Sequence, residues 1–257
     1  MPIFRRQGLK AAGLALASAG LAKMAAAEPP NPLFGPGAHA LEALKAHLSA
    51  LPRRRDFKTV PMILDQWEQW DAQALDTVLH YPGGPRQAWD NTDLTGPWLN
   101  VMRNSMNAQV WSFKHPDFLC VSATHGPAHL ALYDDAMWDK YSLARIAGGS
   151  VTHNSFVALS PAAGADARDY QNPNGPFSDK ANGIRALQQR GAVFLACHNA
   201  IWELASRLID SDINPDKLDI GALAAELTNH LIQDVILTPG VVATLAELSR
   251  SGFSYVR

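Results

Sequence analysis

Cysteine is scarce in this sequence, because only Cys120 and Cys197 occur in a chain of 257 residues. Several familiar catalytic motifs are missing as well: there is no C-x-x-C-H, G-x-S-x-G or H-E-x-x-H, and there is no phosphate-binding P-loop. Their absence argues against covalently attached haem, an α/β-hydrolase serine site, a zincin metal site and a P-loop nucleotide site.

A surplus of positive charge is also lacking. The chain has 22 Lys and Arg residues against 24 Asp and Glu, a net charge of −2. Residues 1–27 hold four of the basic residues and no acidic one, so the chain without them has 18 − 24 = −6. This balance does not favour nucleic acid as a partner. The basic cluster Arg53–Arg55 is explained better by a solvated turn than by a phosphate site.

The N-terminus is typical of a cleaved export signal, since a basic start, a mildly apolar run and small residues follow one another up to Ala27. The pair Arg5 and Arg6 matches the core of a twin-arginine signal. A Sec signal and a membrane anchor are the alternatives, although the apolar run is short for a membrane span. We expect export through the twin-arginine route, cleavage after Ala27, a periplasmic location and no stable membrane insertion of the mature chain.

Strand-like and helix-like patterns alternate from Ala74 onward. The expected strands cover residues 74–80, 118–124, 192–197 and 234–238, with one more possible at 155–159. Such alternation predicts an α/β fold with three layers, α/β/α, around a mostly parallel sheet of about five strands. We expect this domain to span 74–257 with an insertion at about 142–179, and residues 28–73 to form a Pro/Gly-rich tail and a helical extension that includes a helix at 38–51.

The two cysteines invite the prediction of a disulfide, because an exported chain meets an oxidising environment. Cys120 lies inside its expected strand, which ends near Thr124, whereas Cys197 ends its own. Four residues of offset at about 3.3 Å each would separate the two by well over 10 Å if the strands are parallel and level. A disulfide needs Cα atoms about 4.4 to 6.8 Å apart. We therefore expect two free thiols.

Ligands of open parallel sheets collect beyond the carboxyl ends of the strands. The residues expected at that edge are His80, His125, Gly126, Cys197, His198, Asn199 and Thr238, the last of which, followed by Pro239, should begin the final helix. Cys197 would open a helix, where unpaired N–H groups and the helix dipole favour a thiolate. A buried structural cysteine is the alternative for Cys197, because a free cysteine also packs well as a small apolar side chain.

Three segments resemble the sulfur-relay family of DsrE and DsrF type proteins: "FLCVSATHGPAHLAL", "GAVFLACHNAIW" and "TPGVVATLAELSRSGFSYVR". The resemblance covers roughly residues 74–257 in the family's order. It implies a five-stranded parallel domain that assembles into homo- or hetero-oligomers, and a persulfide on Cys197. His198 or His125 would then stabilise the thiolate, and His80, Gly126, Asn199 and Thr238 would contact the substrate.

Two functions stay open at this point. One is a periplasmic sulfur carrier or sulfurtransferase-like protein that uses an exposed, reactive Cys197. The other is a non-catalytic oligomeric module that binds a small ligand or partner at the same edge, which a buried Cys197 would favour. We expect no cofactor and no metal site, because Cys120 should point into the core and the spacing of His115, His125 and His129 fits no tight chelate.

A polar stripe follows from the spacing of Asn100, Asn104 and Asn107, which places the three on one face of the helix expected after Thr95. Such a stripe is explained best by a solvated face, and a contact with a partner subunit is the alternative.

Overall fold

The computed structural model describes residues 31–149, 151–158 and 166–257. The expected signal peptide, residues 1–27, lies outside these ranges. The helices of the described residues are α1 His39–Ala50, α2 Ala72–Leu79, α3 Trp98–Asn107, α4 Asp135–Lys140, α5 Leu143–Ile146, α6 Ile184–Gln189, α7 His198–Asp210, α8 Ile220–Asn229 and α9 Val241–Arg250. The strands are β1 Arg86–Asn91, β2 Leu119–Thr124, β3 Val193–Cys197, β4 Ile236–Thr238 and β5 Ser254–Val256. Short 3₁₀ or π turns are η1 Trp67–Gln69, η2 Ala108–Ser112, η3 Gly126–Leu132, η4 Ser155–Val157 and η5 Ala167–Asp169.

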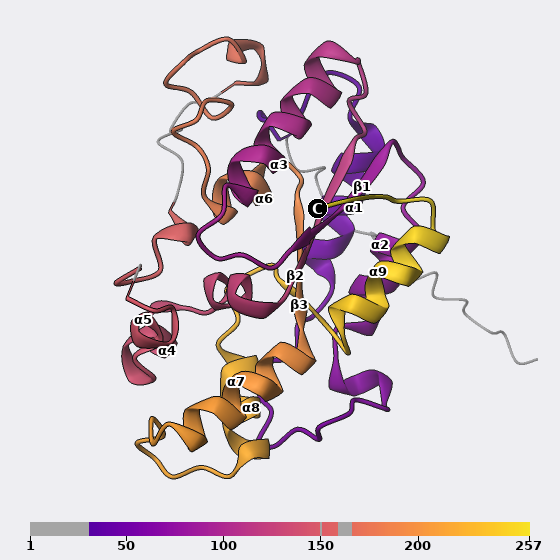
Figure 1. Cartoon of the computed structure of the whole chain (residues 1–257). Coiled ribbons are helices and arrows are strands. Elements are labelled where there is room, and N and C mark those ends of the chain that lie inside the picture. Colours follow the sequence, from indigo (N-terminus) through magenta and orange to yellow (C-terminus); the bar gives the residue numbers. More distant parts are fainter. Residues whose placement is uncertain (1–30, 150, 159–165) are drawn as a thin grey trace, which may run out of the picture.

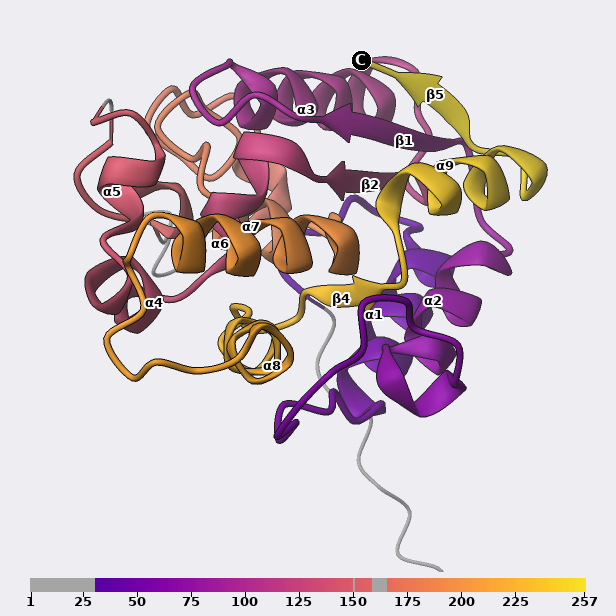
Figure 2. The same ribbon diagram turned by 60° about the horizontal axis from the view of Figure 1, so that its bottom comes forward.

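The five strands form one sheet in the order β4-β3-β2-β1-β5, and every neighbouring pair is parallel. Helices cover both faces, with α3, α6, α7 and α8 on one side and α1, α2 and α9 on the other (Figures 1 and 2). The prediction of a three-layer α/β/α fold around a parallel sheet is therefore confirmed. Parallel strands need crossover connections, and the helices between them supply these while burying both faces.

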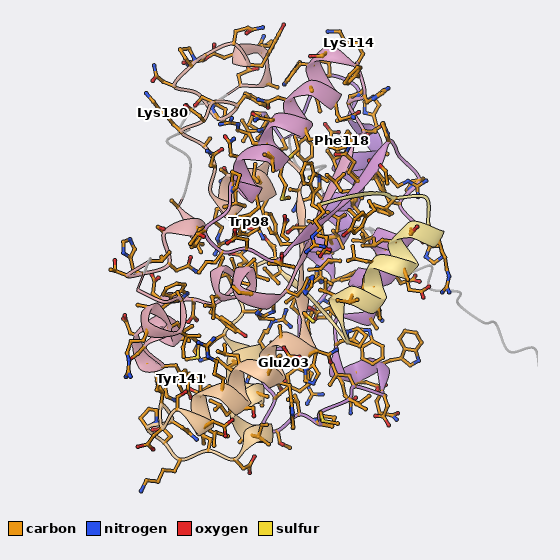
Figure 3. The ribbon with its side chains drawn as sticks, in the orientation of Figure 1. Trp98, Lys114, Phe118, Tyr141, Lys180 and Glu203 are labelled. Carbon is orange, nitrogen blue, oxygen red and sulfur yellow. The ribbon has the colours of Figure 1, made fainter. Side chains whose placement is uncertain are left out.

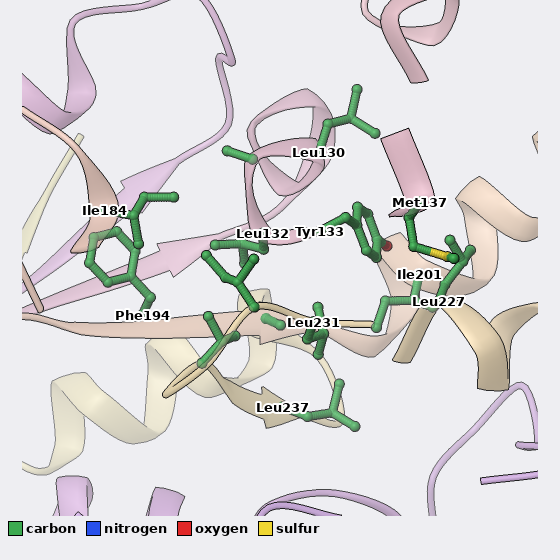
Figure 4. Close-up of a cluster of buried hydrophobic side chains, with 14 of the residues drawn as sticks. Leu130, Leu132, Tyr133, Met137, Ile184, Phe194, Ile201, Leu227, Leu231 and Leu237 are labelled. Atoms are coloured by element: carbon green, nitrogen blue, oxygen red, sulfur yellow. The ribbon is translucent and has the colours of Figure 1, made fainter. Parts of the chain in front are cut away.

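Alternate residues of the strands point into two separate cores. The larger core lies under α3, α7 and α8, and Figure 4 shows Phe194 of β3 in it together with Leu132, Tyr133, Ile201 and other residues. The second core lies on the opposite face and contains apolar side chains of α1, α2 and α9, among them Leu44, Val78 and Leu248. The helices that precede residue 80 thus cover one face of the sheet.

The strand expected at residues 74–80 is wrong, because these residues belong to helix α2. The buried residues of α2 have the spacing of one helical face: Ala74, Leu75 and Val78. In so short an apolar run this spacing is hard to distinguish from the pattern of a strand. The strand of this part of the chain is β1, and the sheet's fifth strand is β5 at the C-terminus. The possible strand at 155–159 is the 3₁₀ turn η4, apart from Leu159, which lies outside the described residues.

The edge of β4 is covered by the segment before α2. Asp71 exchanges two hydrogen bonds with Leu237 of β4: its backbone N–H donates to the Leu237 carbonyl (3.1 Å), and its carboxylate accepts the Leu237 N–H (2.7 Å). Arg55 donates to both oxygens of this buried carboxylate, at 3.2 and 2.9 Å. Within the basic cluster, at least Arg55 therefore forms an ion pair with the buried Asp71 carboxylate and does not belong to a solvated turn.

In residues 31–149, 151–158 and 166–257 no helix is long and apolar enough to cross a membrane.

Candidate functional site

The carboxyl ends of β2, β3 and β4 meet at one edge of the sheet. Thr124 pairs with Ala196, and Cys197 pairs with Thr238, so the residues that follow these strands come together as the alternation predicts. His80 does not join them. It follows α2 and leads into β1, and the neighbouring Tyr81 donates its hydroxyl to the carbonyl of Asp117, just before β2 begins. His80 therefore belongs to the amino edge, because the strand that was expected to carry it is a helix.

Cys197 ends β3 and immediately precedes α7. Its side chain lies in the core on the α9 side, with the residue 4% exposed. The backbone N–H of Val241, the first residue of α9, donates to Sγ at 3.3 Å. The sulfur thus lies at the beginning of two helices, where N–H groups are free to donate. Its position is the one expected for a reactive thiol, but the thiol is enclosed.

Cys120 points to the opposite face of the sheet and belongs to the core under α3. Burial raises the pKa of its thiol well above the ordinary value, against a smaller opposing effect of Arg190. Both cysteines are free. The expectation that Cys120 points into the core is confirmed, and the two thiols lie on different sides of the sheet.

His125 follows β2 and is held by a carboxylate. Its Nε2 lies 2.7 Å from Oδ1 of Asp90 in β1, and the hydroxyl of Tyr255 in β5 donates to Oδ2 of the same carboxylate at 2.6 Å. Burial by itself would raise the pKa of Asp90, but the hydrogen bonds from Tyr255 and His125 outweigh it and hold that pKa below its ordinary value. The three side chains join the ends of β1, β2 and β5.

His129, in turn η3, is a site residue that the sequence pattern indicates only as a possible metal ligand. The backbone N–H of Cys197 donates to its Nε2 at 3.1 Å, so the ring proton is on Nδ1. This Nδ1 is buried and has no hydrogen-bond partner in the described part of the chain. Burial, with a smaller effect of His125, lowers the pKa of His129 to about 3, so the imidazole is neutral. Its partner lies 68 residues away, and no local pattern reveals such a contact.

A pocket of about 230 Å³ opens beside these residues, between turn η3 and helix α7. Its lining is Gly126, Pro127, His129, Leu130, Ile146, Ala200, Glu203, Leu204 and Arg207. Gly126 has φ of +54°, which permits the turn that separates β2 from this wall. Glu203 and Arg207 stand on adjacent turns of α7, both exposed, and Figure 3 labels Glu203 there.

His198 is the first residue of α7, but its ring points away from Cys197. Its Nε2 donates to the carbonyl of Pro61 at 2.8 Å, and burial lowers its pKa despite that bond. Within the described ranges no hydrogen bond joins a histidine to Sγ of Cys197. The arrangement therefore offers the thiol the backbone N–H of Val241 rather than an imidazolium.

Asn199 and Thr238 complete the predicted set. Asn199 is exposed, and its amide nitrogen lies against Gly240, where an added Cβ would be 3.1 Å away. Thr238 is buried and donates its hydroxyl to the carbonyl of Ala196 at 2.9 Å. Gly240, and not Thr238, is the N-cap of α9, so that detail of the prediction is wrong.

In the part of the chain that the structure describes, no three His, Cys, Asp or Glu side chains gather into a group that could hold a metal ion. Comparison of the chain with protein-family models, with curated proteins and with solved structures finds no significant match.

Proposed function

We propose that this chain binds a small organic ligand in the pocket between η3 and α7, as a binding module with a DsrE-like fold. The observation that carries the proposal is His129, a neutral imidazole in the pocket wall whose buried Nδ1–H has no partner in the described residues. Buried donors without partners are rare and costly. Nδ1 is closed off from the pocket in this structure, so a ligand acceptor would reach it after a small movement of the wall. The pocket lies where open parallel sheets bind their ligands.

The lining indicates the kind of ligand. Pro127, Leu130, Ile146 and Leu204 give the wall an apolar character, while Glu203 and Arg207 bring one charge of each sign to α7. At about 230 Å³ the pocket is smaller than sites for drug-sized molecules, which begin at about 300 Å³. A compact, partly apolar molecule with a hydrogen-bond acceptor and one charged group fits this description.

The test is a ligand-observed NMR screen with small aromatic and aliphatic carboxylic acids and amines. Ala200→Trp fills the pocket, whereas Asp210→Trp places the same side chain on the exposed last turn of α7. We expect compounds that bind the wild type and Asp210→Trp but not Ala200→Trp, and an affinity loss of about 10-fold in Arg207→Gln for the acids, as for one lost charged hydrogen bond. Hits that survive in Ala200→Trp would contradict the proposal.

A second candidate is sulfur carriage on Cys197, as the resemblance to sulfur-relay proteins implies. The favouring observation is the Val241 N–H on Sγ, because a donor at the start of a helix stabilises a thiolate or a persulfide anion. With thiosulfate, the thiolate would attack the sulfane sulfur, the S–S bond would break, and sulfite would leave with the bonding electron pair. Cys197 would then hold a persulfide. Because Cys197 is only 4% exposed, the reaction requires the surrounding side chains to open a path to Sγ while the Val241 N–H stays in place.

Mass spectrometry of intact protein after incubation with thiosulfate or polysulfide tests this candidate. Sulfur carriage predicts a gain of one sulfur atom in the wild type and in Cys120→Ser, and none in Cys197→Ser. Alkylation of folded protein should also be faster at Cys197 than at Cys120, whose burial raises its thiol pKa. If Cys197 resists alkylation in the folded protein and forms no sulfur adduct, the sulfur-carrier hypothesis is wrong. The ligand-binding module is then the remaining candidate.

Export and assembly belong to the same proposal. A twin-arginine signal ending at Ala27 would deliver the folded chain to the periplasm, and the family resemblance implies an oligomer. The signal is supported by Arg5 and Arg6 in the sequence.

A further inference from the structure

A buried arginine after helix α6 lacks a counter-charge. Arg190 is 5% exposed, and Arg103 of α3, whose charge it feels, is 6% exposed. Among the described residues no carboxylate oxygen lies within 4.0 Å of either guanidinium, although ion pairs occur elsewhere in the fold. Burying a charge without a counter-charge is costly, so such residues are normally paired.

Neutral amides take the place of carboxylates here. Asn100 and Asn104 accept from Nη2 of Arg103 at 2.9 and 2.7 Å, and Asn107 accepts from Nη2 of Arg190 at 2.6 Å. The asparagine stripe thus binds the two arginines and is not simply a solvated face. Nη1 of Arg190 still has no acceptor in the described ranges.

The guanidinium of Arg190 nevertheless stays charged at neutral pH. Burial lowers its pKa to about 9, and the neighbouring Arg103 adds to that effect. Because this value is above neutral pH, the fold contains a buried cation that no carboxylate of the described residues neutralises by direct contact. Glu28 is the one acidic residue of the sequence that lies outside the described ranges.

A small cavity adjoins Arg190, at the place where the N-terminal segment, turn η2 and the loop before α6 meet (Figure 1). Leu33 and Phe34 line it from the N-terminal segment, Trp111 lines it from η2, and Phe177 lines it from the loop. Its volume is about 10 Å³, which is room for one water-sized particle. The size alone limits an occupant to a water molecule or a monatomic ion.

The polar side-chain atoms of this wall that lack partners are all donors. They are Nη1 of Arg190 and the indole Nε1 of Trp111, both buried and without an acceptor in the described part of the chain. The other side chains of the lining are apolar. A buried water makes about two to four hydrogen bonds, and here it would find no side-chain acceptor for its own hydrogens. A halide ion only accepts, so it matches this wall better.

The ring of Phe177 connects the two donors. It lies 4.5 Å from Cζ of Arg190, and it meets the Trp111 ring edge-on with the centroids 5.8 Å apart. Tyr170, from the same loop, stacks on Trp111 with the centroids 4.3 Å apart. The residues that would hold an ion therefore also hold the loop before α6.

We infer that this cavity binds a chloride ion, held between the guanidinium of Arg190 and the indole N–H of Trp111. Chloride supplies the missing counter-charge and accepts from both donors. Both nitrogens are covered in this structure, so a small movement of the two side chains would bring them against the ion. The bound ion would stabilise the folded chain, because only folding brings these distant segments together.

The test follows the indole N–H resonance of Trp111 in the full chain labelled with ¹⁵N, assigned with Trp111→Phe. Sodium chloride replaces sodium gluconate at constant ionic strength, and urea midpoints are measured in the same two salts. We expect a saturable shift with chloride and with bromide and none with gluconate or sulfate. The midpoint should be higher in chloride than in gluconate.

A substitution that provides an internal counter-charge sharpens the test. Asn107→Asp places a carboxylate on Arg190, so the chloride affinity should fall at least about 10-fold, as for one lost charged hydrogen bond, and chloride should no longer raise the midpoint. Asn199→Asp, at an exposed position of α7, is the matched control and should keep both responses. Glu28→Gln should keep both as well, because the inferred counter-charge is the ion.

Saturable chloride binding that weakens in Asn107→Asp and not in Asn199→Asp supports the site. Three results would overturn the inference. The Trp111 resonance could show no saturable shift, as a cavity that holds only water predicts. Gluconate or sulfate could shift it with the affinity of chloride, which indicates an adventitious ion only. Asn107→Asp could bind chloride as tightly as the wild type does.

Discussion

His129 shows how one buried nitrogen can make a whole fold sensitive to acid. Burial lowers its pKa to about 3, whereas an unfolded histidine titrates at about 6.5. Between these values the unfolded chain takes up a proton that the folded chain refuses. The free energy of unfolding should therefore decrease as the pH falls from about 6.5 towards 3, by up to about 1.4 kcal/mol per pH unit from this residue.

Chemical denaturation of wild type and His129→Gln between pH 7 and pH 4 measures this contribution. The glutamine keeps an acceptor for the Cys197 N–H and does not titrate, so the wild type should lose stability relative to the variant as the pH falls. His47→Gln, on the exposed side of α1, controls for the loss of a histidine. Parallel pH profiles for wild type and His129→Gln would show that His129 is not held neutral.

At the residue scale the sequence located Cys197 well, because an apolar run that ends in cysteine before a helical pattern marks the end of a strand. It could not show that the thiol is enclosed, because the residues of the core around it are distant in sequence; Val241, whose N–H donates to Sγ, lies 44 positions further along the chain. His125 was likewise placed at the correct edge, while its partners Asp90 and Tyr255 come from strands that were not expected.

Strand β4 has only three residues, and its free edge is sealed by the segment before α2. Asp71 forms two hydrogen bonds with Leu237 and an ion pair with Arg55. Asp71→Ala leaves the Leu237 N–H without its acceptor and the partly buried guanidinium of Arg55 with backbone carbonyls alone, so we expect a loss of about 2–4 kcal/mol in the free energy of unfolding. Asp65→Ala, at an exposed position, should change it by no more than about 0.5 kcal/mol. Denaturant unfolding of both variants measures these changes. Equal midpoints would show that the contacts of Asp71 at the β4 edge contribute little to stability.

Among the elements, the strands β2, β3 and β4 were predictable because they are short apolar runs followed by turn or helix signals. Strand β1 was not, since four of its six residues are polar. Those side chains are satisfied far along the chain: Gln87 by Ser105, Asn91 by Ser122 and Asp90 by His125. A strand whose polar groups pair at such separations has no local signature, and the apolar face of α2 beside it resembled a strand.

On the scale of the whole molecule, both ends of the described chain build the same core. Leu44 of α1 and Val78 of α2 share it with Val241 and Leu248 of α9, and β5 pairs with β1. The core on this face is therefore complete only when residues near position 40 and residues near position 250 are both present. This face of the sheet therefore cannot close before synthesis has passed residue 250.

A core that needs both ends of the described chain forms late, so an export route that transports folded proteins would be compatible with it. The twin-arginine signal proposed at the N-terminus would direct the chain to such a route. We expect the double substitution Arg5→Lys with Arg6→Lys to leave uncleaved precursor in the cytoplasm. Lysine keeps the positive charge that a Sec signal requires, so a Sec-exported chain would still reach the periplasm. Lys10→Gln, which preserves the arginine pair, is the control and should be exported and cut after Ala27. Fractionation with N-terminal sequencing distinguishes the routes: mature protein in the periplasm from the double variant would rule out the twin-arginine route.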